Sequence, residues 1–204
     1  MERAGGDWAG PGTRDDAILS RMNVPQRRMT VTEFLDWAKA QPSGRYELVD
    51  GQVVAMSPER ARHNLAKARL WRALTDAVER ADLPCTVFTD GMTVVIDQHR
   101  SCEPDAAIQC GDTMSLDSVV LDEPLVVVDV VSPSSGLDDT GVLVDYFSVP
   151  SIQHYLVVDP EKRTIVHHSR LASDIRTRIL DEAGDLSLDP PGLTMPAIDL
   201  LREL

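Results

Sequence analysis

The chain has 204 residues and a mass of 22.4 kDa, the size of one domain. Its 20 basic and 33 acidic residues give a formal net charge of −13, and 43% of the residues are hydrophobic. This composition is typical of a soluble globular protein, and the charge argues against capture of nucleic acid by a broadly basic surface. It does not exclude a nuclease, because a metal site needs local carboxylates that bound cations partly neutralise.

Two further classes are excluded by the residue pattern. No apolar run approaches the ~18 residues of a membrane-spanning helix, and the N-terminus lacks the apolar stretch of a signal peptide. The cysteines Cys85, Cys102 and Cys110 form no CxxC pair, so the sequence indicates neither a disulfide framework nor a zinc site. We therefore expect a cytoplasmic protein that does not associate with membranes.

The first elements expected along the chain are an extension and a helix. Residues 1–28 mix glycine, proline and charge without periodicity, which predicts a flexible N-terminal extension, and the folded domain is expected to span residues 29–204. Thr30 or Thr32 can cap a helix whose apolar positions follow a 3.6-residue period. That helix is expected to end at residues 41–44, which read Gln-Pro-Ser-Gly.

A hairpin and a long helix follow. The apolar segments 46–49 and 52–56 flank Asp50-Gly51, a dipeptide typical of a tight β-hairpin. From 60 to 80, apolar residues return every three or four positions, which predicts the longest helix of the chain. Its basic residues are expected to lie away from the apolar stripe.

The rest of the chain is expected to be rich in strands. Residues 125–131 form an almost wholly apolar run, which marks a strand buried on both faces of a sheet. The consecutive histidines at 167 and 168 alternate faces of a strand and are expected at the surface. The other predicted elements are strands at 86–88, 92–96, 105–108 and 176–180, a hairpin of 154–158 with 164–168, and helices at 139–147 and 197–204. This order predicts a mixed α/β fold with a central sheet and flanking helices.

Asp129 is the most informative residue of the buried run. Burying an ionised carboxylate among apolar neighbours costs several kcal/mol unless it is paired, metal-bound or neutralised. Near the C-terminal end of its strand, Asp129 can emerge at the edge of the sheet, where ligands of α/β folds lie. The alternative is a strand-end aspartate that caps the amide of Ser132 or Ser134.

Asp105, 24 positions earlier, is the second candidate. Because Pro104 cannot donate to a central ladder, Asp105 is expected at the start of its strand. If the two strands are antiparallel neighbours, Asp105 and Asp129 face one another, and two such carboxylates repel unless a proton or a divalent cation lies between them. Oxygen ligands of this kind suit Mg²⁺ or Mn²⁺. Alternatively, Pro-Asp forms an ordinary turn.

Several short motifs occur in order between residues 30 and 200. They are Tyr46-Glu47-Leu48-Val49-Asp50-Gly51, Met56-Ser57-Pro58, His63, Asp90-Gly91-Met92, Glu103-Pro104-Asp105, Val128-Asp129-Val130-Val131-Ser132-Pro133 and Tyr155-Leu156-Val157-Val158-Asp159-Pro160. Together they resemble the bacterial "putative restriction endonuclease" family of the PD-(D/E)XK nuclease superfamily. The resemblance implies a restriction-endonuclease-like α/β core with a central mixed β-sheet flanked by helices, a divalent-metal site and hydrolysis of phosphodiester bonds.

The resemblance also implies roles for individual residues. It makes Asp105 and Asp129 catalytic, metal-binding acids, with the main-chain carbonyl of Val130 completing the shell of a Mg²⁺ or Mn²⁺ ion. Glu47 would be a third acid or an outer ligand, although a surface glutamate beside a turn is an equal alternative. The cation would lower the pKa of a bound water and neutralise charge on the scissile phosphate.

One part of the family pattern is missing. The superfamily places a lysine two residues after the second acid, where this chain has Val131, and relatives that carry it on the following helix have it at a point where this chain reads Val142-Leu143. On the long helix, Lys67, Arg62 and Arg69 are candidates to replace it, although an arginine does not release its proton as a lysine can. We also expect these three bases to contact nucleic acid.

Two functions therefore stay open. The retained acids favour a metal-dependent DNA endonuclease. The missing lysine favours a catalytically inactive nuclease-fold module that binds nucleic acid or protein. A homodimer assembled through the valine-rich strands is a further alternative.

Overall fold

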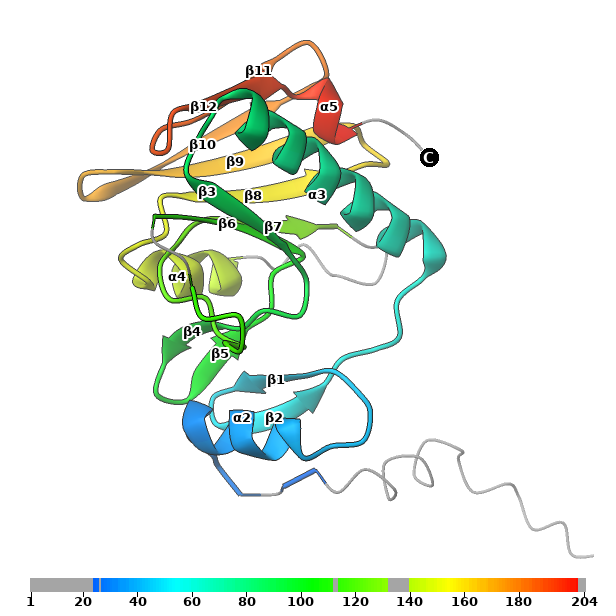
Figure 1. The fold of residues 1–204 in the computed structure, drawn as a ribbon, viewed down its shortest axis with the longest axis vertical. Helices are drawn as coiled ribbons and strands as arrows, with labels where there is room; N and C mark the ends of the chain where they lie inside the picture. The colour runs from blue at the N-terminus through cyan, green and yellow to red at the C-terminus, as the bar shows by residue number, and fades with distance from the viewer. Residues whose placement is uncertain (1–23, 26, 112–113, 132–139, 202–204) are drawn as a thin grey trace, which may run out of the picture.

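The computed structural model describes residues 24–25, 27–111, 114–131 and 140–201 (Figure 1). Most of the expected N-terminal extension, together with the segment that follows the buried run, lies outside these residues. The described elements are α2 (Val31–Lys39), β1 (Tyr46–Val49), β2 (Gln52–Ala55), α3 (Ala61–Arg80), β3 (Cys85–Thr89), β4 (Val94–Asp97), β5 (Arg100–Cys102), β6 (Ala106–Cys110), β7 (Pro124–Val130), α4 (Thr140–Ser148), β8 (His154–Asp159), β9 (Thr164–Leu171), β10 (Asp174–Leu180), β11 (Asp185–Leu188), β12 (Leu193–Pro196) and α5 (Ile198–Leu201).

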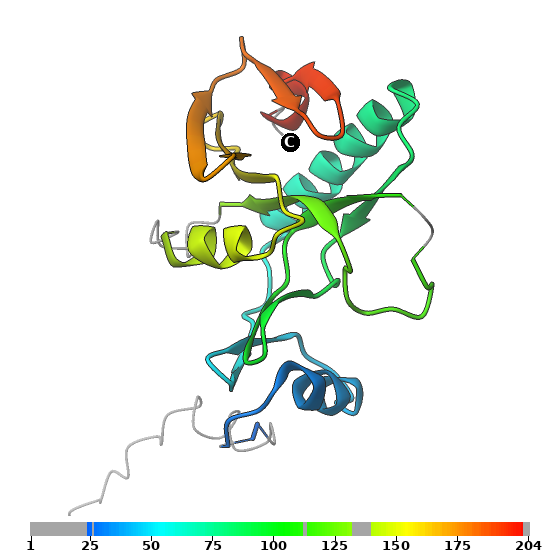
Figure 2. The ribbon, with the colours of Figure 1, turned by 90° about the vertical axis from the view of Figure 1, so that its left-hand side faces the viewer.

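The centre of the molecule is a six-stranded sheet in the order β10-β9-β8-β7-β6-β3. Among its described pairs, β7 and β8 run parallel and are joined through α4, whereas the others are antiparallel. Figures 1 and 2 show α3 and α4 on opposite faces of this sheet. The predicted fold, a central mixed sheet flanked by helices, is confirmed. No described helix is long and apolar enough to cross a membrane.

Strand β7 carries the core on both of its faces, as its apolar run predicts. Val126 and Val128 pack with side chains of α3 and α5 in one cluster. Val127 packs on the other side with Tyr146 of α4 and with Tyr155 of β8. Because these three valines are fully buried, β7 is fixed in register, and so is Asp129 near its end.

The N-terminal elements form a smaller layer on one side of this core. Thr30 caps α2 and forms a capping box with Glu33, as one of the two predicted caps. Asp50 and Gly51 both have positive φ, 48° and 78°, which the tight β1–β2 turn requires. Strand β1 also pairs with β5, and β5 pairs with β4, in a four-stranded sheet of the order β2-β1-β5-β4. The sequence did not predict β5, and the pairing of β1 with it brings Glu47 close to the segment that leads into Asp105.

The expectation that the cysteines form no disulfide is wrong. Cys85 and Cys110 are bonded to each other, 25 positions apart in the sequence. They are direct partners in the β3–β6 ladder, with Cα atoms 3.9 Å apart. Such a pair depends on strand register, which a local cysteine pattern does not contain.

The expectation that both histidines of β9 lie at the surface is also wrong. His167 is only 3% exposed, and a ring nitrogen lies 2.9 Å from a ring nitrogen of His154 at the start of β8. Strand β10 covers one edge of β9, and the loop that contains Pro190 closes over the pair, so this side of β9 faces the core.

Candidate metal centre

Asp105 and Asp129 stand opposite one another at one end of the β6–β7 ladder. The two strands are antiparallel and Ala106 pairs with Val128, so the next residues outward, Asp105 and Asp129, face each other. Residues in such positions have Cβ atoms about 4.5–5.5 Å apart. The predicted meeting of one strand's start with the other's end is therefore confirmed.

Asp105 contacts both β7 and helix α3. Its Oδ2 accepts a 2.7 Å hydrogen bond from the amide of Val130, and its Oδ1 lies 3.4 Å from Nζ of Lys67. Burial raises the pKa of Asp105, although that amide and Lys67 act in the opposite direction. The carboxylate is thus held in place by the strand end and retains an oxygen that faces the helix.

Asp129 is the most strongly perturbed acid of the site. Burial, followed by the charge of Asp105, raises the pKa of Asp129 to about 7. The hydroxyl of Tyr155 donates a 3.0 Å hydrogen bond to Oδ2 of Asp129 and partly opposes this shift. Burial also raises the pKa of Glu47, and the charges of Glu103 and Asp105 add to the effect. The three predicted acids are therefore electrostatically coupled, with more negative charge than their surroundings compensate.

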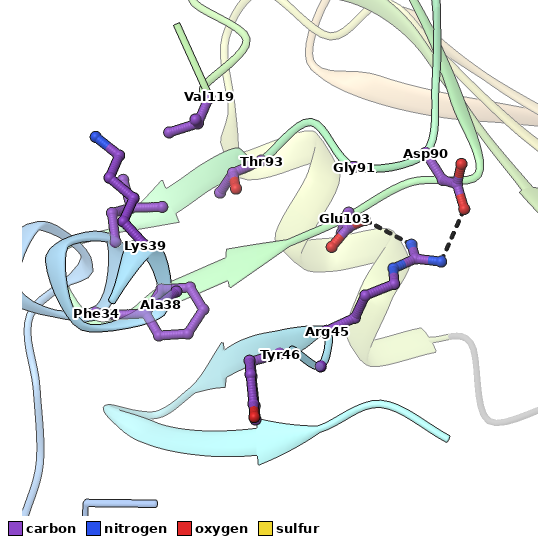
Figure 3. Close-up of a pocket in the computed structure, with 12 residues that line it drawn as sticks. Phe34, Ala38, Lys39, Arg45, Tyr46, Asp90, Gly91, Thr93, Glu103 and Val119 are labelled. Atoms are coloured by element: carbon purple, nitrogen blue, oxygen red, sulfur yellow. Dashed lines mark hydrogen bonds and ion pairs between the residues drawn. The ribbon is translucent and has the colours of Figure 1, made fainter. Parts of the chain in front are cut away.

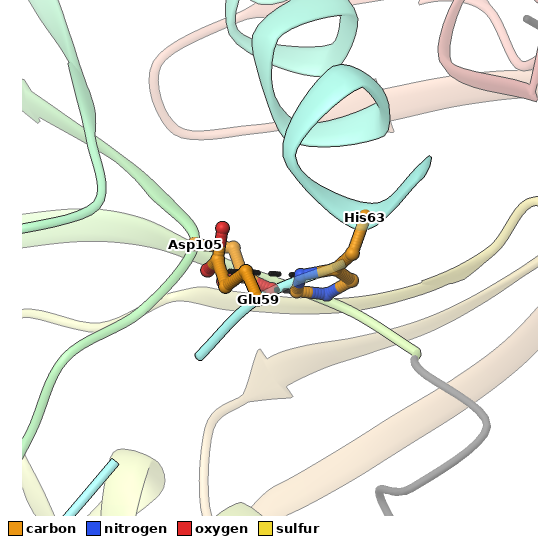
Figure 4. Close-up of side chains that lie close together, drawn as sticks. All are labelled: Glu59, His63 and Asp105. Atoms are coloured by element: carbon orange, nitrogen blue, oxygen red, sulfur yellow. Dashed lines mark ion pairs between the residues drawn. The ribbon is translucent and has the colours of Figure 1, made fainter. Parts of the chain in front are cut away.

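Helix α3 and the segment before it add two groups at this point, shown in Figure 4. Nε2 of His63 lies 3.6 Å from Oδ2 of Asp105, and Nδ1 lies 3.7 Å from Oε1 of Glu59. Ligand atoms of Glu59, His63 and Asp105 all lie within 4.8 Å of one another, the one such trio among the described residues. Glu47 and Asp129 lie beside this trio rather than in it.

The hydrogen bond made by His63 fixes its tautomer. Nε2 lies 2.8 Å from the carbonyl oxygen of Val130, and a carbonyl can only accept, so Nε2 carries the hydrogen. The lone pair of a neutral ring is then on Nδ1, toward Glu59. His63 thus holds the same carbonyl that the resemblance assigns to the metal shell, a role that the sequence did not reveal.

Lys67 belongs to these acids and not to the surface of α3. Its side chain is 5% exposed and forms ion pairs with Glu59, Asp90 and Asp105. Burial disfavours its charge, but the hydrogen bonds to Asp90 and Glu59 outweigh burial and raise the pKa of Lys67. We refer to Glu47, Glu59, Asp90, Asp105, Asp129 and Lys67 together as the acid cluster.

The other two predicted bases are exposed on α3. Arg62 is 73% exposed and pairs with Glu161 at 2.7 Å, and Arg69 is also exposed. Placing Lys67 on the same outer face as these arginines was therefore wrong. Contact of Arg62 and Arg69 with nucleic acid stays a prediction.

A groove of about 370 Å³ opens beside the acid cluster (Figure 3). At its inner end, Arg45 pairs with Glu103 at 2.5 Å and with Asp90 at 2.8 Å. Because Asp90 also pairs with Lys67, the groove and the acid cluster share a wall. The groove is lined by Phe34, Leu35, Ala38, Lys39, Gly44, Arg45, Tyr46, Asp90, Gly91, Thr93, Glu103 and Val119.

The chemistry of the donor groups fits a divalent cation. Most of the available atoms are carboxylate and carbonyl oxygens, which suit Mg²⁺ or Mn²⁺, and one imidazole nitrogen lies beside them. A cation placed against Asp105 and Asp129 would also relieve the repulsion that raises the pKa of Asp129.

Known proteins resemble this chain over most of its length. The protein slr1290 of Synechocystis sp., described as uncharacterized, is 27% identical over 144 residues, which cover 69% of this chain and 74% of that protein. A crystal structure of a "putative nuclease belonging to DUF820" from Anabaena variabilis has a TM-score of 0.66 and 16% identity, over 85% of this chain and 97% of that one. At this identity the likeness shows the fold. Residues 31–198 match the family Uma2, described as "Putative restriction endonuclease". The chain therefore belongs to the Uma2 family of restriction-endonuclease-like proteins.

Proposed function

We propose that this protein is a divalent-metal-dependent endonuclease that hydrolyses phosphodiester bonds of DNA. The observation that supports it best is the position of Asp105 opposite Asp129 at the end of the β6–β7 ladder, with the pKa of Asp129 raised to about 7. Acids whose pKa is strongly perturbed by burial and by a neighbouring charge are typical of functional sites. Membership of a family described as "Putative restriction endonuclease" adds to this support.

Asp105, Asp129 and the carbonyl of Val130 would hold the cation, with Glu47 next to them. Each of these groups is already oriented by a neighbour: Asp105 by the amide of Val130, Asp129 by Tyr155, and the carbonyl by His63. Such orienting contacts are typical of metal sites. The bound cation would supply an activated water and would neutralise charge on the phosphate.

DNA would approach along the start of α3. Arg62 and Arg69 are exposed on this helix, which begins next to the acid cluster. These local bases would have to offset a net charge of −13, so we expect binding that weakens steeply with salt. The DNA strand would lie in the neighbouring groove, beside these acids.

A second candidate is the catalytically inactive module that binds nucleic acid or protein. One observation favours it: between Arg100 and Lys162 the sequence contains no lysine or arginine, so neither β6, β7 nor α4 can supply a base. The same fold would then serve binding alone.

Cleavage of supercoiled plasmid in Mn²⁺ or Mg²⁺ distinguishes the two candidates. We expect nicking that stops when EDTA is added. In Asp105→Asn and Asp129→Asn the cleavage rate should fall by at least about 100-fold, because loss of even an outer contact to a metal ligand lowers metal affinity or activity by ~10–100-fold. Asp185→Asn, an exposed aspartate of β11, is the matched control and should cleave normally. Metal binding by a wild-type protein that cleaves nothing would support the inactive module instead.

A further inference from the structure

The acid cluster contains one buried ammonium group, that of Lys67. Hydrolysis of a phosphodiester builds negative charge on the phosphate oxygens, and positively charged donors fixed beside it stabilise the transition state. The chain from 101 to 161, which includes both strands of the site, contains no lysine or arginine. A fixed positive side chain must therefore come from another element.

Helix α3 delivers Lys67 to this place. His63 and Lys67 lie one turn apart on the face of α3 that continues through Leu70 and Leu74 into the core. The apolar stem of Lys67 is thus buried with the helix, while Nζ lies 3.4 Å from Oδ1 of Asp105 and 2.5 Å from Oδ2 of Asp90.

The ion pairs around Lys67 separate its contact with Asp105 from the others. Asp90 and Glu59 each have a second cation, because Arg45 lies 2.8 Å from one and 3.2 Å from the other. Among the described ion pairs, Asp105 has no arginine partner. It pairs only with Lys67 and with the ring of His63. The feature specific to Lys67 is therefore its position at the acid that also faces Asp129.

We propose that Lys67 is a catalytic residue of this site, whose ammonium group contacts the scissile phosphate and the attacking water beside the cation held by Asp105. The inference rests on the proposed function. Water adds to phosphorus, one P–O ester bond breaks, and the proton lost by the water reaches the leaving oxygen through solvent. Lys67 stays an ammonium throughout and donates hydrogen bonds to the phosphate oxygens. It takes the place of the lysine that the sequence lacks after Asp129.

The test compares single-turnover cleavage of plasmid in Mn²⁺ by Lys67→Gln, Lys67→Arg and the wild type. We expect Lys67→Gln to lower the rate by about 100- to 1000-fold, the effect of removing one transition-state donor. Lys67→Arg should keep the fold, since the charge is retained, but recover only a small part of the rate because its planar group has another shape. Lys162→Gln is the matched control: the same change at an exposed lysine that pairs with Asp159.

Mn²⁺ affinity measured by calorimetry without DNA gives a second readout. Removing a positive charge next to Asp105 removes repulsion of the metal, so Lys67→Gln should bind Mn²⁺ about tenfold more tightly. Methylammonium ions added to Lys67→Ala should restore part of the cleavage by entering the space of the lost side chain, and should restore none in Asp105→Ala. A purely structural role of Lys67 would give no such rescue.

The outcomes separate this inference from the proposed function. Wild-type cleavage that Lys67→Gln retains would overturn the role of Lys67 and leave the endonuclease intact. Unchanged Mn²⁺ affinity in Lys67→Gln would also overturn it, because the ammonium would not lie beside the metal. A wild-type protein that binds Mn²⁺ without cleaving DNA would defeat the endonuclease, and Lys67 would then be only an internal counter-ion.

Discussion

Two clusters of buried polar side chains differ in how their groups are satisfied. In the acid cluster, several carboxylates share the positive charges of Lys67 and Arg45, and the pKa of Asp129 is raised to about 7 by burial and by Asp105. In the second cluster, His154 and His167 pair with each other and carry no charge. Burial lowers the pKa of both histidines, that of His167 to about 4.

The hydrogen bonds of the histidine pair fix the tautomer of each ring. Nε2 of His154 lies 3.0 Å from the carbonyl oxygen of Pro190, so it must donate. Nδ1 of His154 then accepts from Nε2 of His167, which leaves Nδ1 of His167 buried without a described partner. Both side chains are at most 4% exposed, so solvent and ligands do not reach them.

The comparison teaches that uncompensated charge, and not burial alone, distinguishes the acid cluster from the histidine pair. A histidine pair can remain buried and neutral because each ring adopts the tautomer that its partner requires. Neighbouring carboxylates have no such neutral arrangement at pH 7 unless one binds a proton, and a divalent cation removes the conflict. Near pH 7 the carboxylates of the acid cluster must therefore share a proton or a cation, whereas the histidine pair is neutral without either.

The largest effect is expected from Asp129→Asn in metal-free protein. The pKa of Asp129 is raised from 3.8 to about 7, so its native form favours the proton, and this contribution to stability is lost as the pH rises through about 7. At pH 8 the wild type buries an ionised carboxylate, and the asparagine variant should gain about 4 kcal/mol in urea unfolding with EDTA. The gain should fall to about 2 kcal/mol at pH 5 and should nearly vanish only below pH 3.8, where the unfolded carboxyl is protonated as well.

The same variant should lose its response to metal. Mn²⁺ should raise the melting temperature of the wild type, because the ion binds the folded state, and should not raise that of Asp129→Asn. An equal gain from the substitution at pH 5 and pH 8, or a metal response that survives it, would contradict the assignment of Asp129. Asp185→Asn again serves as the exposed control.

The central part of the site could be predicted from the sequence because its signals are local. Pro104 marks the start of one strand, the apolar run from 125 to 131 marks the other, and their pairing follows if the strands are neighbours. The Asp50-Gly51 turn and the long helix are equally local, and the structure has both. These elements depend on backbone constraints and periodicity, which a single sequence contains.

The remainder depends on contacts between distant segments. Glu59 precedes α3 and shows its role only when β6 lies next to it. Lys67 had a usable signal, since it follows His63 by four positions and precedes Leu70 by three, on the buried face, but its charge suggested the solvent side. The Cys85–Cys110 bond and the His154–His167 contact both require strand register. Strands β11 and β12 were missed because they depend on a turn with prolines at 190 and 191.

An intermediate effect is expected at the histidine pair. The pKa of His167 falls from 6.5 to about 4 on folding, so its stabilising contribution is complete above pH 6.5 and is lost as the pH falls toward 4. Chemical unfolding of the wild type should show a loss on the order of 2 kcal/mol from this group over that range. His167→Asn cannot take up this proton and should show a shallower slope; an unchanged slope would assign the acid sensitivity to other groups.

The smallest effect is expected at the exposed pair of Arg62 and Glu161, which is the reference for both buried clusters. Because Arg62 is 73% exposed, breaking the pair by Arg62→Gln or by Glu161→Gln should change stability by less than about 1 kcal/mol.

The two variants should differ in binding of DNA, measured at several salt concentrations with Ca²⁺ in place of Mn²⁺. Arg62→Gln should weaken binding and lower the salt slope by about 1, as expected for one lost phosphate contact. Glu161→Gln breaks the same ion pair but removes a negative charge, so its binding should stay equal or become tighter. If both variants weaken DNA binding alike, the ion pair itself positions the helix, and the start of α3 is not where the DNA backbone lies.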